Sequence, residues 1–172
     1  MTLLPALLSL ALVKPQTGLP IILTNLTWRR ALGCIVFLGA TLVVDRTWPL
    51  RWLPQIQRYD SYIPLFALPV GMLLPLALIR WRQKRAQFLF AMALVPQRGI
   101  YDLLSLWSLL ETPRQLIILN GLSWVLYGLV VVGIPIPFPI LSVTLMYLPF
   151  LVIVLRVSIA NAIQSWSVPK RE

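Results

Sequence analysis

The sequence contains no histidine, one cysteine and five acidic residues among 172. Without histidine, the chain lacks the commonest metal ligand and the commonest general base. The single cysteine, Cys34, lies inside an apolar run, so the sequence predicts neither a disulfide framework nor a metal site. A glycine-rich phosphate loop, a Ser/His/Asp set and carboxylates paired at helical spacing are also missing. We therefore predict no cofactor.

Charge is scarce as well. Charged residues make up 12% of the chain, against about a quarter in soluble domains, whereas hydrophobic residues make up 59%. Mean hydropathy is +0.83. A helix needs about 20 apolar residues to cross a bilayer core of ~30 Å, and several stretches of the sequence reach or approach that length. The composition predicts a polytopic membrane protein.

The formal net charge of +10 does not indicate nucleic-acid binding, because the cations do not form a soluble basic face. They stand at the ends of apolar runs, in turns at 29–30, 80–85 and 170–171. This is the pattern of the positive-inside rule. If the chain crosses a membrane at each break, most of the 15 lysines and arginines fall on the side of Arg29. The basic turns are therefore expected in the cytoplasm, with the protein in a bacterial inner membrane.

Apolar runs separated by charged or proline-rich turns predict an all-α integral membrane helix bundle. We expect a single transmembrane domain over residues 1–172, with five to six spans, two of them broken. The helical segments are expected at 2–13, 19–26, 31–44, 61–79, 86–95, 100–110, 116–133 and 140–155. Residues 45–60 are expected to form a polar loop whose tryptophans lie at headgroup level.

Two similar phrases, Lys14-Pro15-Gln16 and Pro96-Gln97-Arg98, interrupt the apolar runs. At 1.5 Å per residue, the helices before them reach only about 15–20 Å, too short to cross a ~30 Å core. Both breaks are expected below the outer membrane surface, where non-helical backbone is tolerated only inside protein or beside a wet cavity. A cation at that depth either binds a ligand or extends its charge to the headgroups, and the sequence leaves both open.

The order of these motifs resembles a known family. An apolar helix, Lys14-Pro15-Gln16, a second apolar stretch and Trp28-Arg29-Arg30 are followed later by Pro96 and Tyr101-Asp102-Leu103. Over about residues 4–110 this resembles the C-terminal half of polyprenyl-phosphate-mannose-type membrane glycosyltransferases and their bacterial relatives, which share the GT-C superfold. The resemblance implies a transferase that uses a lipid-phosphate-linked sugar. The family's catalytic acid lies in a first outer loop upstream of Lys-Pro-Gln, so we expect a truncated module.

Four residues at the breaks are candidate ligand groups. Lys14 and Arg98 are candidates for binding the lipid phosphate, since a cation in a low-dielectric cleft attracts an anionic headgroup strongly. Gln16 and Gln97 are candidate substrate contacts, because their amides can bond sugar hydroxyls. The alternative is that the glutamines bond the carbonyls freed at each broken helix.

Two further candidates follow the second break. Tyr101 is either a substrate contact or an interfacial aromatic residue. Asp102 is the candidate catalytic group, as a carboxylate that activates a sugar hydroxyl. The alternative for Asp102 is an ion pair with Arg98, four residues earlier on the same helix face, that locks the break.

Two functions are therefore expected. The first is a glycosyltransferase-like module that handles a polyprenyl-phosphate sugar. The second is a non-catalytic membrane subunit that stabilises or anchors a larger complex. In both cases the partners are membrane lipids and another membrane subunit. A small transporter is a third, less favoured class, because only one acidic residue lies near either break.

Overall fold

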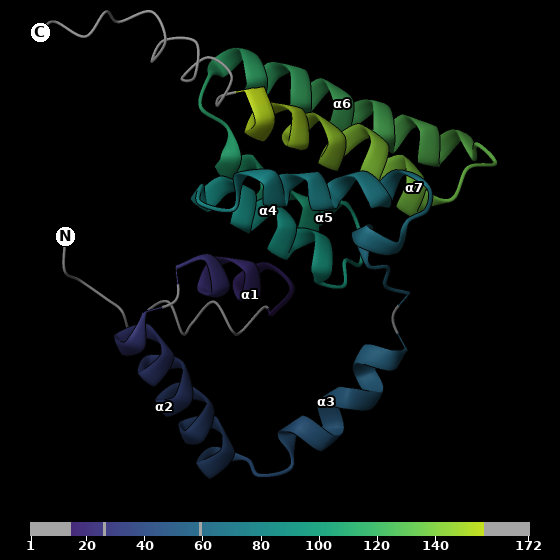
Figure 1. The fold of residues 1–172 in the computed structure, drawn as a ribbon. Helices are drawn as coiled ribbons and strands as arrows, with labels where there is room; N and C mark the ends of the chain where they lie inside the picture. The colour runs from purple at the N-terminus through teal and green to yellow at the C-terminus, as the bar shows by residue number, and fades with distance from the viewer. Residues whose placement is uncertain (1–14, 26, 59, 157–172) are drawn as a thin grey trace, which may run out of the picture.

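The computed structural model describes residues 15–25, 27–58 and 60–156 (Figure 1). Every regular element in these ranges is a helix, so the predicted all-α class is confirmed. The expected helix over 2–13 and the basic pair at 170–171 lie outside the described residues. In chain order the elements are α1 (Pro15–Thr24), α2 (Trp28–Val44), α3 (Trp48–Gln57), η2 (Pro64–Phe66), η3 (Val70–Arg80), α4 (Lys84–Leu94), α5 (Ile100–Leu103), η4 (Leu104–Leu109), α6 (Pro113–Val132), α7 (Phe138–Ser142) and η5 (Val143–Tyr147).

Within the described ranges, two helices are long and apolar enough to cross a membrane: α6 and the continuous helix Phe138–Arg156, which contains α7 and the π-helical turn η5. They run antiparallel, side by side (Figure 1). At 20 residues, α6 is about 30 Å long. It begins with a capping box, in which Thr112 and Gln115 each accept a backbone N–H of the other. It ends at Gly133, whose φ of 74° favours glycine.

The described residues hold fewer spans than the five to six expected. α2 and α3 together add a third candidate, although they are bent by 95°. The other apolar runs form the shorter helices Val70–Arg80 and Ile100–Leu109. The run over 61–79 loses length because proline lacks the N–H that a helix interior needs, and Pro64 and Pro69 stand before η3.

The prediction of a polar loop over residues 45–60 is wrong in one respect, since most of this segment is the helix α3. Pro49 is the second residue of this helix. A missing N–H costs nothing there, because the first four N–H groups of a helix have no partner within it. Pro54 lies inside α3, where its missing N–H removes one hydrogen bond of the helix.

Polar contacts gather the basic turns at one end of the structure, which is called the basic end below. Lys84 Nζ donates to the Thr24 carbonyl at the end of α1, at 2.5 Å. Arg85 forms an ion pair with Glu111, just before α6. Because Lys84 begins α4 and Glu111 follows η4, the segment between them enters from the basic end and returns to it. It is a helical hairpin.

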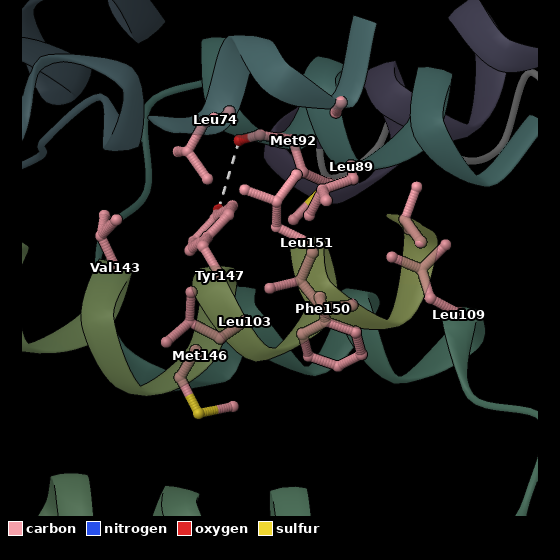
Figure 2. Packing of buried hydrophobic residues seen from close by; sticks show 14 of the residues in the cluster. Leu74, Leu89, Met92, Leu103, Leu109, Val143, Met146, Tyr147, Phe150 and Leu151 are labelled. Carbon is pink, nitrogen blue, oxygen red and sulfur yellow. Dashed lines mark hydrogen bonds between the residues drawn. The ribbon is translucent and has the colours of Figure 1, made fainter. Parts of the chain in front are cut away.

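The core lies where this hairpin meets η3 and the C-terminal helix (Figure 2). Leu74, Leu89, Met92, Tyr147 and Phe150 are all fully buried there. α1 packs against α4 on the other side of the hairpin. By contrast, α2 contains no buried residue. The hairpin that carries the second sequence break is thus the centre of the packed body.

Candidate functional site

The chain leaves helical geometry at the second break, as the sequence predicts. α4 ends at Leu94, Val95 is extended (ψ 134°), and α5 begins at Ile100. Between them, Gln97 pairs with Tyr62 as an antiparallel bridge. The Gln97 N–H donates to the Tyr62 carbonyl at 2.8 Å, and the Tyr62 N–H donates to the Gln97 carbonyl at 3.0 Å. The break is therefore held by the segment that precedes η2.

The side chain of Gln97 is fully buried at this break. Its Nε2 donates to the carbonyls of Val95, at 3.1 Å, and Met92, at 3.4 Å, which the end of α4 leaves free. Its Oε1 is buried and has no hydrogen-bond partner among the described residues. Exchanging the amide atoms would turn the oxygen toward two carbonyls, so the orientation is fixed. One acceptor therefore remains available to a donor from outside this part of the chain.

Asp102 is also buried, with 5% exposure. Its Oδ2 accepts the backbone N–H of Arg98 at 3.0 Å. Asp102 is the third residue of α5, the position from which an acidic side chain reaches back to satisfy N–H groups ahead of a helix. The structure thus brings Arg98 and Asp102 together, and this contact runs to the Arg98 backbone. It supports the expected role of Asp102 in locking the break.

The sequence analysis missed three polar residues that surround the break. Tyr62 packs edge-on against Phe138, with ring centroids 5.6 Å apart. Ser142 is fully buried and donates to the Pro139 carbonyl. Tyr147 donates through its hydroxyl to the Met92 carbonyl at 3.3 Å (Figure 2). Polar side chains inside otherwise apolar runs were the available signal in the sequence.

These residues form one group, which we call the break cluster. The backbone bridge joins Tyr62 to Gln97, and the Gln97 amide and the Tyr147 hydroxyl both donate to the Met92 carbonyl. Its members are Tyr62, Gln97, Asp102, Ser142 and Tyr147.

A groove of about 490 Å³ lies on the other face of α5, between α5–η4 and α6. Tyr101 lines it, together with Trp107, Trp124 and Tyr127. The rings of Trp124 and Tyr127 meet edge-on, 6.0 Å apart. The indole N–H of Trp107 is buried without a hydrogen-bond partner in the described ranges. The groove therefore offers aromatic surface and one buried donor.

Polar side chains on α6 complete the groove. Asn120 and Ser123 line it one helical turn apart. The Ser123 hydroxyl donates to the Asn120 carbonyl at 2.7 Å, which leaves its oxygen as an acceptor. Tyr101 lines the groove, whereas Asp102, the next residue of α5, belongs to the break cluster. The groove and the break cluster therefore lie on different faces of α5.

The first break is described only in part. α1 is described from Pro15, the first residue of the described ranges. Lys14 lies outside the described residues, and Gln16 is placed only as a backbone position of α1. Whether the two breaks share a cavity stays a prediction.

Among the described residues, no three His, Cys, Asp or Glu side chains come together as a metal site would require. Comparison of the chain with protein-family models, curated proteins and solved structures finds no match.

Proposed function

We propose that this protein is a membrane-embedded module that binds a lipid-phosphate-linked sugar. The observation that supports this best is the groove, in which four aromatic side chains stand beside Asn120 and Ser123. A sugar has apolar ring faces, which pack on aromatic rings, and hydroxyls, which need hydrogen-bond partners. A concave site with aromatic walls and a few placed polar groups fits that chemistry.

Arg98 supplies the charge for the phosphate in this proposal. It is half-buried at the break, beside the first turn of α5. A cation that is partly removed from water binds an anionic headgroup through charge-assisted hydrogen bonds. Lys14 would reach the phosphate from the first break, whereas Gln97 is fully buried and bonds the carbonyls at the end of α4.

The position of Asp102 argues against catalysis by this chain alone. Its carboxylate is buried and accepts the Arg98 N–H, which is a structural role. We therefore propose binding and presentation of the lipid-linked sugar, in the manner of a glycosyltransferase-like module, with the catalytic acid supplied by another membrane subunit.

The proposed topology puts the basic end in the cytoplasm. The hairpin would be re-entrant and replace one broken span, with the break facing the outer half of the bilayer. In a Cys34→Ser background, a cysteine at Arg82 should resist an impermeant thiol reagent added to intact cells. Labelling of this cysteine from outside would reverse the topology.

The binding proposal is tested with the full chain in nanodiscs. The probes are short-chain polyprenyl-phosphate-mannose, polyprenyl phosphate and the uncharged polyprenol. Native mass spectrometry measures how much of each probe binds. Trp124→Leu should weaken binding of the mannosyl probe by roughly 0.5–1.5 kcal/mol, the range for one aromatic contact. Trp81→Leu is the matched control, since Trp81 is exposed and does not line the groove.

Arg98→Gln tests the phosphate contact separately. It should weaken both phosphorylated probes by about 1.5–3 kcal/mol and leave polyprenol unchanged, because the amide keeps a donor but loses the charge. Equal binding of all three probes by the unmodified protein would contradict the proposal. So would a Trp124→Leu variant that binds mannosyl lipid normally.

A second candidate function is a non-catalytic membrane subunit, and α2 favours it. This 17-residue apolar helix buries none of its residues against the described chain. Cys34 lies on α2 and is the only cysteine of the sequence, so it can carry a photo-crosslinker without further mutation. One defined protein adduct, formed from native membranes, would support a subunit role. Adducts to lipid alone would favour the binding module.

A further inference from the structure

The corner between α2 and α3 sets two helices almost at right angles. α2 begins at Trp28, Arg29 and Arg30 and continues for 14 further residues, 31–44, about 21 Å. α3 then leaves at 95° to it. If α2 crosses the membrane, α3 lies parallel to the membrane surface, at the end of α2 away from Arg29 and Arg30.

α3 has separate apolar and basic faces. At 100° per residue, Trp48, Trp52 and Leu53 fall within one arc of the helix. Arg51, and Arg58 just beyond the end of the helix, fall on the opposite arc. The rings of Trp48 and Trp52 meet edge-on, 6.1 Å apart. Leu53 is 51% exposed and Trp52 36%, whereas Trp48 is half-buried and its indole N–H is covered. The open part of this face is therefore at Trp52 and Leu53.

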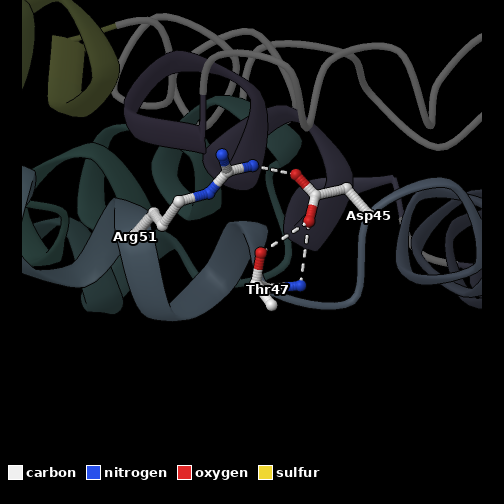
Figure 3. A network of polar contacts seen from close by, with 3 residues as sticks. All are labelled: Asp45, Thr47 and Arg51. Atoms are coloured by element: carbon white, nitrogen blue, oxygen red, sulfur yellow. Dashed lines mark hydrogen bonds and ion pairs between the residues drawn. The ribbon is translucent and has the colours of Figure 1, made fainter.

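The corner itself is fixed by Asp45 (Figure 3). Its Oδ1 accepts the Thr47 backbone N–H, at 2.9 Å, and the Thr47 hydroxyl, at 2.8 Å. Its other oxygen pairs with Arg51. Over residues 45–60 three arginines, at 46, 51 and 58, stand against two carboxylates, Asp45 and Asp60. The corner therefore presents excess positive charge beside an apolar face.

We infer that α3 is an interfacial helix that binds anionic phospholipid. Trp48, Trp52 and Leu53 enter the boundary between headgroups and acyl chains, where amphipathic aromatic rings are favoured. The arginines of the segment contact lipid phosphate. A basic residue near an anionic membrane surface contributes about 1 kcal/mol, which is roughly a fivefold change in lipid preference.

Helix depth gives the first test, on the full chain in lipid bilayers. Spin labels are placed singly at Arg51→Cys, Leu53→Cys and Arg58→Cys in a Cys34→Ser background. An in-plane helix puts the labels at 51 and 58 at equal, shallow depth and the label at 53 deeper. If α3 instead continues across the membrane, the labels at 51 and 58 differ by about 10 Å, which would overturn the inference.

Lipid identity gives the second test. Photoactivatable phosphatidylglycerol and phosphatidylcholine are compared in nanodiscs, and adducts on α3 peptides are counted. Arg58→Gln should lower the preference for phosphatidylglycerol about fivefold. Asp45→Asn should raise it, because the amide still accepts from Thr47 but releases the charge of Arg51. Arg114→Gln, an exposed arginine at the basic end, is the control and should change nothing on α3.

These outcomes separate lipid from other occupants. Equal yields with the two lipids would refute the charge contact. A lower preference in Asp45→Asn, or protein adducts replacing lipid adducts on α3, would also overturn the inference. None of these results depends on the polyprenyl-phosphate site, which lies at the break and the groove.

Discussion

Gly71→Ala should damage the fold at one well-defined contact. Gly71 is the second residue of η3 and is buried beneath η2. A β-carbon added there would lie 2.5 Å from the carbonyl oxygens of both Leu65 and Pro64. Ordinary van der Waals contact begins at 3.4 Å, so η2 would have to move away by roughly 0.9 Å. The obstructing atoms are backbone, so a rotamer change cannot relieve the clash.

Inserting a methyl group into a packed site costs about 1–3 kcal/mol, and a backbone obstruction predicts the upper end of this range. For a chain of this length, 1 kcal/mol corresponds to about 2–4 °C, so the unfolding temperature should fall by roughly 6–12 °C. The assay is thermal unfolding of the full chain in detergent, and near-UV circular dichroism is the signal that is recorded. Since η2 follows Tyr62 directly, the bridge to Gln97 should loosen as well.

Gly128→Ala is the matched control. Gly128 lies in α6, and a β-carbon there would meet nothing within 4 Å. Alanine is favoured over glycine in a helix interior by about 0.8–1.0 kcal/mol, so this variant should unfold at the same temperature as the unmodified protein or slightly higher. If the Gly71→Ala and Gly128→Ala variants have the same unfolding temperature, the close approach of η2 to η3 is not a feature of the folded protein.

Two further outcomes are expected. Thr112→Ala should destabilise α6 by about 1 kcal/mol through loss of its capping box, whereas Thr112→Ser should retain it, and equal unfolding temperatures for the two would refute the cap. Tyr147→Phe should cost about 0.5–1.5 kcal/mol, because it removes the hydrogen bond to the Met92 carbonyl; amide exchange in α4 that stays as slow as before would argue against that bond.

Features that depend on a few neighbouring residues were predictable. The helical class follows from apolar runs that can satisfy their own backbone only as helices, and the break near Pro96 follows from the missing N–H of proline. The shared end of the basic turns follows from the cost of placing cations in a bilayer core. Asp102 as a locking residue was an open alternative, and the structure supports it through the Arg98 backbone.

The tertiary structure decided what these local features contact. The sequence does not reveal that Gln97 pairs with Tyr62, or that Tyr147 reaches the Met92 carbonyl from 55 residues away. Such contacts depend on how whole helices pack, and the two residues of each pair carry no common pattern. The pairing of the short apolar runs at 84–94 and 100–109 into a hairpin also depended on packing, since an ion pair between Arg85 and Glu111 closes it. The groove exists only because α5 and α6 meet, so residues over a wide stretch of sequence had to fold together before their chemistry could be recognised.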